Sequence, residues 1–149
     1  MVAGAGMAMA FAAPAQATTS PRVVTMAASS PMPAVLPAAP AGCTAGNLCF
    51  WKNKGFNDGP GKLAGTNSDW RVFSHATCAG GVWNDCASSL FNADTVDAEV
   101  VFKDIDFGGD SRCLPLGASF TDLSTVAYTT GGRSNMNDSI SSNRLTPAC

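Results

Sequence analysis

A motif that occurs twice constrains this chain more than any other feature of its sequence. The segment WNDCASSLF contains Asn84, Asp85 and two serines, and NMNDSISSNRL repeats the same spacing 53 residues later. Asn, Asp and Ser are common in turns because their short side chains hydrogen-bond to the nearby backbone, so one copy alone would indicate only a turn. Two copies indicate that a whole supersecondary unit is duplicated.

Two further landmarks recur in the same order as the motif. Each copy begins with two aromatic residues five positions apart and a glycine soon after them: Trp51, Phe56 and Gly59, then Phe102, Phe107 and Gly109. An acidic tripeptide follows, SDW at 68–70 and TDL at 121–123, again 53 residues apart. Three landmarks at nearly constant spacing support an internal duplication of the domain.

The elements between these landmarks have the pattern of strands. Short apolar runs such as NLCFW, RVF, EVVFK and RCLPL are separated by Gly, Asn, Asp and Ser. This punctuation favours strands and turns, and no run has a helical period with capping residues. We therefore predict one all-β domain over residues 43–149, which is an ordinary size for a single domain.

The first 42 residues have a different composition. Residues 1–17 are uncharged, rich in Ala, Met and Gly, and end in AQA. This ending is typical of a secretory signal peptide, which predicts a secreted, extracellular protein. The positively charged start of such peptides is missing, so a disordered Ala-rich leader is the alternative. Residues 18–42 contain five prolines and predict a disordered Pro/Ala-rich linker.

Charge and composition exclude several classes of function. Charged residues are 13% of the chain and the net charge is −2, which provides neither a basic surface for nucleic acid nor a polybasic segment for a membrane. The chain has one histidine, no nucleophile elbow and no phosphate loop, so we do not expect an enzyme. We expect a monomer.

Six cysteines lie between residues 43 and 149. An even number in a compact region predicts a disulfide framework and an oxidising compartment. A thiolate metal centre is disfavoured, because no C-x-x-C motif occurs. Six cysteines allow fifteen pairings. Short loops and the chain end are the easiest to close, which favours the pairs Cys43–Cys49, Cys78–Cys86 and Cys113–Cys149.

The aromatic–x4–aromatic–glycine corner, the Asp-Trp or Asp-Leu pair and the Asn-Asp-x-x-Ser-Ser motif together resemble the Greek-key motif of the βγ-crystallins. The resemblance implies a βγ-crystallin-like sandwich of two Greek-key motifs, one over about 47–92 and the other over about 96–146. With the predicted signal peptide and the opening CTAGNLCFWKNKGFNDGPG, the chain is most similar to secreted bacterial members of this group. These include the actinobacterial metalloproteinase inhibitors, so the resemblance implies an extracellular protease as the partner.

The same resemblance implies a calcium site in each copy. Such a site takes the acidic residue of the motif, its first serine, the carbonyl after the Asn-Asp pair and the carbonyl after the first corner aromatic. In this sequence these are Asp85, Ser88, Cys86 and Lys52 in the first copy, and Asp138, Ser141, Ser139 and Lys103 in the second. Calcium prefers oxygen ligands. The lysine ammonium groups should weaken binding, and a disulfide at Cys86 should distort the first loop, so the second copy is the better candidate.

A peptidase inhibitor needs a stiff, extended, substrate-like loop, because such a loop loses little entropy on docking. The best candidate is the span that a Cys78–Cys86 disulfide would close, with the inhibitory residues Cys78, Ala79, Gly80, Gly81 and Val82. The two glycines act against this stiffness. The alternative is a calcium-binding structural or toxin-like domain that inhibits no protease.

Overall fold

The computed structural model of the chain describes residues 36–132 and 134–149, together with Met1. Apart from Met1, the predicted signal peptide lies outside the described residues, and so does the predicted linker up to residue 35. Residues 36–40 form no strand or helix, yet Leu36 and Pro37 line a cavity of about 150 Å³ together with Phe91. Packed structure therefore begins before residue 43, where the change in composition suggested the boundary.

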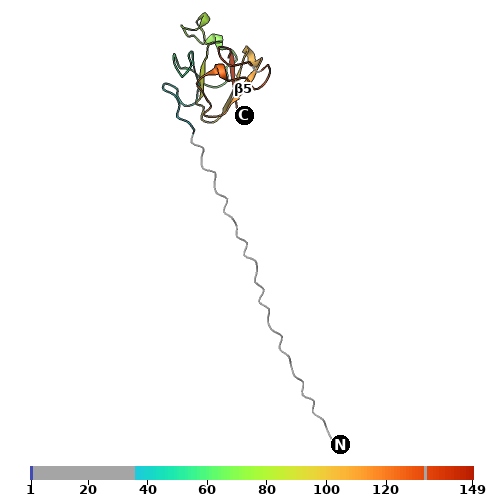
Figure 1. Cartoon of the computed structure of the whole chain (residues 1–149). Helices are drawn as coiled ribbons and strands as arrows, with labels where there is room; N and C mark the ends of the chain where they lie inside the picture. The colour runs from blue at the N-terminus through green and yellow to red at the C-terminus, as the bar shows by residue number, and fades with distance from the viewer. Residues whose placement is uncertain (2–35, 133) are drawn as a thin grey trace. The chain divides into compact units, whose positions relative to one another are not determined.

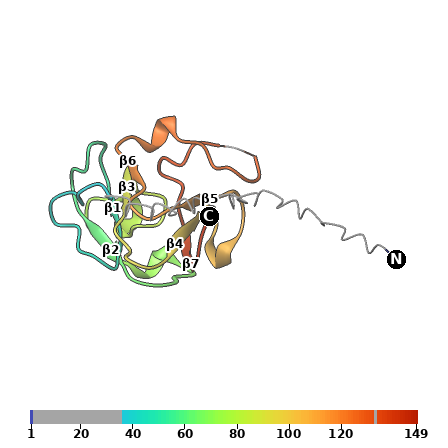
Figure 2. The same ribbon diagram turned by 90° about the horizontal axis from the view of Figure 1, so that it is seen from below.

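Within the described residues, seven short strands form two antiparallel sheets (Figure 1) (Figure 2). The four-stranded sheet has the order β2 (Gly61–Leu63), β1 (Leu48–Trp51), β3 (Ser89–Asn92) and β6 (Ser119–Phe120). The three-stranded sheet has the order β5 (Ser111–Leu114), β4 (Ala98–Phe102) and β7 (Ser142–Thr146). The predicted all-β sandwich is confirmed.

Helical structure in this part of the chain is limited to four 3₁₀ turns of three residues each: η1 (Trp70–Val72), η2 (Ala79–Gly81), η3 (Ile105–Phe107) and η4 (Leu123–Thr125). Asp69 and Asp122 begin η1 and η4, and each side chain accepts a hydrogen bond from the backbone N–H two residues later. Such caps satisfy a donor that a turn leaves free. Among the described residues, no helix is long and apolar enough to cross a membrane.

The two copies exchange segments between the sheets. Strand β6 belongs to the second copy but pairs with β3 of the first copy, with Leu90 opposite Phe120. At the equivalent position of the first copy, Asn67 forms an antiparallel bridge with Asn143 of β7. Each sheet thus includes backbone from both copies, so the duplication seen in the sequence produces one interlocked unit with a shared core.

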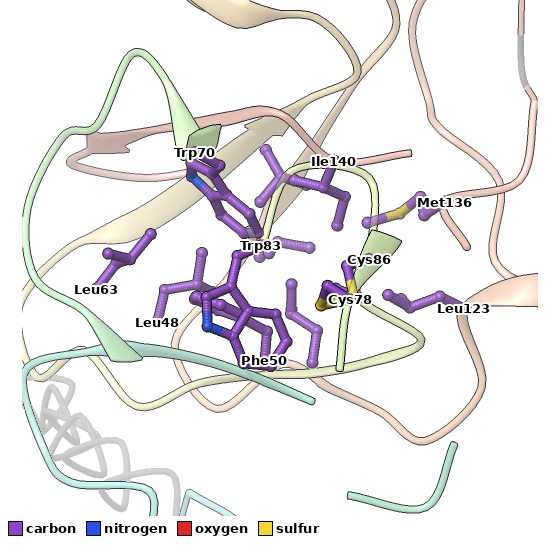
Figure 3. Packing of buried hydrophobic residues seen from close by; sticks show 14 of the residues in the cluster. Leu48, Phe50, Leu63, Trp70, Cys78, Trp83, Cys86, Leu123, Met136 and Ile140 are labelled. Carbon is purple, nitrogen blue, oxygen red and sulfur yellow. A yellow bond between two sulfur atoms is a disulfide. The ribbon is translucent and has the colours of Figure 1, made fainter. Parts of the chain in front are cut away.

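The core lies between the sheets and is rich in aromatic residues. Figure 3 shows part of this cluster, in which the Phe50 and Trp70 rings stack with their centroids 4.5 Å apart. Trp83 meets Phe50 edge-on at 4.7 Å. Large aromatic side chains bury the most apolar surface per residue and prefer stacked or edge-on contacts. A second, smaller cluster on the other face of β1 joins Trp51 to Phe91.

Three disulfides join the pairs that short loops and the chain end favour: Cys43–Cys49, Cys78–Cys86 and Cys113–Cys149. Their Cα–Cα distances are 5.8, 5.8 and 5.5 Å, within the usual range for disulfides. The Cys78–Cys86 bridge is buried in the main core cluster, so its sulfur atoms pack as apolar side chains as well as closing a loop (Figure 3).

Candidate functional site

The two Asn-Asp-x-x-Ser-Ser motifs lie face to face and exchange hydrogen bonds. Ser88 Oγ donates to Asp138 Oδ1 over 3.3 Å, and Ser141 Oγ donates to Asp85 Oδ1 over 3.1 Å. Each serine therefore contacts the aspartate of the opposite copy, as expected for related loops. These serine–aspartate contacts form only when the two copies dock.

Backbone bonds hold this exchange in register. The Asp85 N–H donates to the Ile140 carbonyl and the Asp138 N–H donates to the Ala87 carbonyl, each over 3.0 Å. Asp85 and Asp138 both adopt left-handed backbone angles, with φ values of 55° and 49°. Asn and Asp tolerate this conformation better than other residues with side chains, which explains why the corner requires this residue type.

The asparagine that precedes each aspartate orients its carboxylate. Asn84 Nδ2 donates to Asp85 Oδ2, and Asn137 Nδ2 donates to Asp138 Oδ2, each over 2.6 Å. The Oδ1 atoms of both asparagines are buried and have no hydrogen-bond partner. Buried polar atoms usually have a partner, so these two acceptors mark the paired loops as a place where a donor or a cation would be stabilised.

Two open cavities flank the paired loops, and both are lined by Asp85 and Asp138. A cavity of about 370 Å³ also contains the first predicted set, Lys52, Cys86 and Ser88. A cavity of about 460 Å³ contains the second set, Lys103, Ser139 and Ser141. The structure thus brings together all eight predicted calcium residues. Sequence reasoning missed Arg71 and Asp104, which also line the larger cavity.

The oxygen ligands of the paired loops fit a hard cation, although together they carry little negative charge. They are oxygen atoms from aspartates, serine hydroxyls and backbone carbonyls, which calcium prefers. No group of three or more His, Cys, Asp or Glu side chains that could hold a metal ion occurs among the described residues. Affinity for divalent cations grows with ligand charge, and the charged ligands of this set are two aspartates.

The predicted inhibitory span forms the tip of a hairpin, residues 74–83, which we call the first hairpin. Ser74 pairs with Val82, and the His75 N–H donates to the Gly81 carbonyl over 2.9 Å. The Gly81 N–H donates to the Cys78 carbonyl over 3.0 Å, and Gly80 has a left-handed φ of 73°. The expectation of an extended span was wrong, because these internal bonds and the glycine angles fold the tip into a compact 3₁₀ turn.

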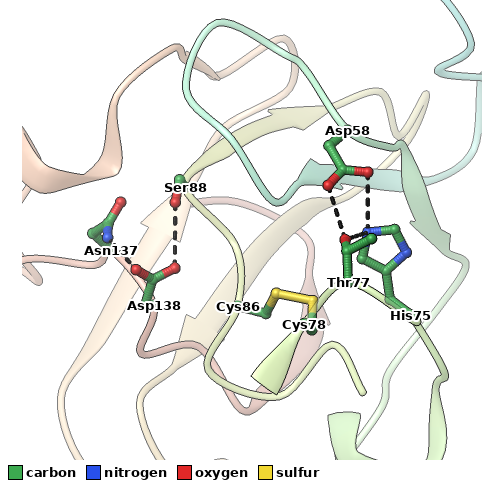
Figure 4. The surroundings of a disulfide bond; sticks show 8 residues. All are labelled: Asp58, His75, Thr77, Cys78, Cys86, Ser88, Asn137 and Asp138. Atoms are coloured by element: carbon green, nitrogen blue, oxygen red, sulfur yellow. Dashed lines mark hydrogen bonds and ion pairs between the residues drawn. A yellow bond between two sulfur atoms is a disulfide. The ribbon is translucent and has the colours of Figure 1, made fainter. Parts of the chain in front are cut away.

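A side-chain cluster ties the first hairpin to the corner after β1, as Figure 4 shows. Thr77 Oγ1 donates to Asp58 Oδ2 over 2.8 Å, and His75 Nε2 lies 3.5 Å from Asp58 Oδ1. The His75 ring stacks on Trp83 with centroids 4.1 Å apart and planes 5° from parallel. His75 is therefore a satisfied loop residue, as expected, although the sequence did not reveal its partners.

The equivalent hairpin of the second copy, described at residues 127–132 and 134–136, shares one backbone bond with the first hairpin and is otherwise held by different side chains. The Tyr128 N–H donates to the Ser134 carbonyl over 3.0 Å, which repeats the bond between His75 and Gly81. Asp110 takes the place of Asp58 and accepts from the Gly132 N–H over 2.6 Å and from Ser134 Oγ over 3.0 Å. The Gly132 bond, assisted by Ser134, lowers the pKa of Asp110. In both copies, a corner aspartate anchors a hairpin tip.

Comparison with known proteins identifies relatives of both the sequence and the fold. A family model described as peptidase inhibitor family I36 matches residues 37–114, more than half of the 149-residue chain. Among curated proteins, no match to the chain was found.

The similar solved structures are βγ-crystallin domains and a related protein. One, from work on the evolution of the eye lens βγ-crystallin domain fold, is 25% identical with a TM-score of 0.54, over 74% of this chain and 94% of that one. Spherulin 3a from Physarum polycephalum is 27% identical with a TM-score of 0.51, over 73% and 91%. A βγ-crystallin from Ciona intestinalis is 23% identical with a TM-score of 0.50, over 68% and 100%. The fold is that of the βγ-crystallins.

Proposed function

Since this chain belongs to peptidase inhibitor family I36, we propose that it inhibits an extracellular peptidase and that the first hairpin makes the contact. The observation that carries the proposal is the family match, which spans the whole of this hairpin. The three disulfides support an oxidising, extracellular location, because such bonds persist outside the cytosol. Nothing in the proposal requires the chain itself to carry out catalysis.

The structure of the first hairpin favours a rigid docking element. Three contacts fix this hairpin: the Cys78–Cys86 disulfide, the Asp58–Thr77 hydrogen bond and the stacking of His75 on Trp83. A pre-ordered loop loses little conformational entropy when it binds. Because the tip is a compact turn, we propose that it enters the peptidase cleft as a wedge rather than lying there as an extended substrate.

A panel of thermolysin-type, subtilisin-type and trypsin-type peptidases tests this function. The oxidised domain should inhibit at least one class with one-to-one stoichiometry. The exposed tip residue Ala79, changed to Glu, should weaken that inhibition about tenfold or more, a loss of ~1.4 kcal/mol, because it adds bulk and charge at the contact. The inhibition constant from titration of peptidase activity is the measurement.

The matched control for this variant is Ala127→Glu, the same change at an exposed position of the second hairpin. It should leave the inhibition constant within about twofold, since single exposed sites rarely affect a distant contact. If no peptidase class is inhibited by the wild-type domain, inhibition is not its function. If inhibition is strong but equal in both variants, another surface makes the contact.

We also propose that the paired loops bind calcium, because the Asn84 and Asn137 Oδ1 atoms are buried without a partner beside exchanged aspartates and serines. Backbone carbonyls would come from Lys52 and Cys86 in the first copy and from Lys103 and Ser139 in the second. The two aspartates would supply the negative charge. A bound cation would supply positive charge between the two carboxylates and so join the copies. Binding should be weak, with a dissociation constant on the order of 10⁻⁵ to 10⁻³ M.

Calcium should raise the melting temperature of the wild-type domain. A free concentration one hundred times the dissociation constant stabilises the native state by roughly 2.7 kcal/mol. Asp138→Ala should remove most of this gain without preventing folding in the absence of calcium, whereas Asp97→Ala, at an acidic residue outside both cavities, should retain it. Thermal unfolding with and without millimolar calcium is the measurement. An unchanged wild-type melting temperature would show that the loops serve the turns alone.

A further inference from the structure

A buried glutamate lies on β4, away from both candidate sites. The Glu99 residue is fully buried, with 0% of its surface exposed. Its Oε2 atom accepts one hydrogen bond, from Asn143 Nδ2 over 3.1 Å, and its Oε1 atom is buried without a partner. A buried carboxylate is stabilised only when its oxygens are paired or fully hydrogen-bonded. This environment therefore favours the neutral acid.

The neighbouring strands offer Glu99 no compensating cation. Its partners in register are Leu114 on β5 and Leu145 on β7, both apolar. Next to these, Arg144 lies over the Phe102 ring, 5.5 Å from its centroid, so its charge is directed to the aromatic corner. Arg112 of β5 is likewise occupied, stacked over Phe120 at 5.2 Å.

The charged groups that act on Glu99 are acidic. Burial raises the pKa of Glu99 to about 7, the hydrogen bond from Asn143 opposes this rise, and the negative charges of Asp94 and Asp97 add to it. Both aspartates lie in the connection between β3 and β4. The protonation state of this carboxyl group therefore changes close to neutral pH while the domain is folded.

Asn143 connects Glu99 to the segment of residues 65–70. Its Nδ2 donates to the Gly65 carbonyl over 2.8 Å as well as to Glu99. Its Oδ1 accepts from Trp70 Nε1 over 2.8 Å and from Asn67 Nδ2 over 3.2 Å. An amide side chain has two N–H donors and two lone pairs, so Asn143 is fully used. It cannot donate a second bond to Glu99 without releasing Gly65.

An aromatic series continues from this amide to the first hairpin. Trp70 stacks on Phe50, and Phe50 contacts Trp83 (Figure 3). Trp83 in turn stacks on His75. Energetic coupling between distant sites is carried by chains of packed side chains that have two discrete arrangements. The segment beside Asn143 and the hairpin therefore share one set of contacts.

We propose that Glu99 and Asn143 form a pH-sensitive latch, which holds residues 65–70 against β7 while Glu99 is neutral and loosens them when Glu99 ionises. Ionised Glu99 requires more hydrogen-bond donors than Asn143 supplies in this arrangement. The additional donors are either the Asn143 N–H that is released when Asn143 turns away from Gly65, or water molecules that enter beneath residues 65–67. Either change disturbs the bond between Asn143 and the Trp70 indole. The latch does not depend on peptidase inhibition or on calcium.

The sign of the pH dependence follows from proton linkage. The folded domain holds the Glu99 proton up to about pH 7, whereas an unfolded chain releases it near the ordinary value of 4.5. Between these two pH values the folded state binds more protons, so its stability falls as the pH rises. The contribution of Glu99 is fully favourable below pH 4.5 and is lost by the time the pH has passed about 7.

The Trp70 indole N–H provides a direct test by NMR. In the wild-type domain we expect its chemical shift, and that of the Asn67 amide, to titrate between pH 5 and 9 with a midpoint near 7. In Glu99→Gln both signals should stay constant. Asp97→Asn is the control, because it removes a neighbouring charge but keeps the latch, so the titration should persist with a lower midpoint. A flat Trp70 signal in folded wild-type protein, or a titration that persists in Glu99→Gln, overturns the proposal.

A stability measurement complements the spectra. The melting temperatures of wild type and Glu99→Gln should diverge from pH 4 to pH 8, with the variant gaining relative to wild type as the pH rises. If the variant does not fold, carboxyl ¹³C signals of the wild-type domain decide instead. A Glu99 carboxyl that titrates with a midpoint near 4.5 rather than near 7 contradicts the latch.

Discussion

Replacing both Cys113 and Cys149 by serine is expected to reduce the free energy of unfolding by about 4 kcal/mol. These residues are 36 positions apart, the largest separation among the three disulfides. In the chain-entropy model, a crosslink restricts the unfolded chain more as its loop grows, and a loop of this length is worth about 4 kcal/mol. The same bond fastens the chain end after β7 to β5. Urea unfolding of the oxidised variant measures the loss.

The matched variant replaces Cys43 and Cys49, which are only six positions apart. Its loss should be about 2.4 kcal/mol by the same relation. The comparison holds the chemistry constant and varies the loop length. Equal losses in the two variants would show that the native contacts of each disulfide, rather than the entropy of the unfolded chain, determine its contribution.

Trp70→Ala is expected to destabilise the domain by about 4 to 6 kcal/mol. The Trp70 residue is 0% exposed, stacks on Phe50 and donates its indole N–H to Asn143. Truncating a buried aromatic residue to alanine costs about 3–5 kcal/mol, and an acceptor left with fewer donors adds about 1 kcal/mol or more. Denaturant unfolding at pH 6 gives the value while Glu99 is largely neutral.

Two further variants separate the causes of this loss. Trp70→Phe keeps most of the packing and removes the hydrogen bond, so it should cost only about 1–3 kcal/mol. Leu123→Ala changes the equivalent position of the second copy, also 0% exposed, and should cost about 3 kcal/mol. If Trp70→Ala proves no more damaging than Leu123→Ala, the indole and its bond contribute little.

Most of the fold could be predicted from the repeated motifs. Residues 53 apart, such as Asp85 and Asp138, occupy equivalent left-handed corners, and this equivalence is visible in the sequence because few residue types tolerate that conformation. The alternation along EVVFK also indicates that Glu99 is buried. In a strand, Glu99 and Val101 point to the same side, and both are fully buried.

Other features depended on how the copies dock and could not be read from local patterns. The duplication indicates that the two loops exchange contacts, but which serine atom meets which aspartate depends on how the copies dock. The compact tip of the first hairpin depends on the backbone angles of Gly80 and Gly81, which glycine permits but does not require. The acidic partner of His75, Asp58, lies in a separate loop, and no sequence spacing links the two residues.

The exchanged serine–aspartate bonds have the symmetry of a two-fold dimer. Ser88 of the first copy meets Asp138 of the second, and Ser141 of the second meets Asp85 of the first. Contacts that repeat in this reciprocal way are those of an isologous interface between two identical molecules. An ancestor with a single copy would have found its complement in another molecule. Joining the copies in one chain replaces that concentration-dependent association with an intramolecular one, so the fused domain stays assembled at any dilution.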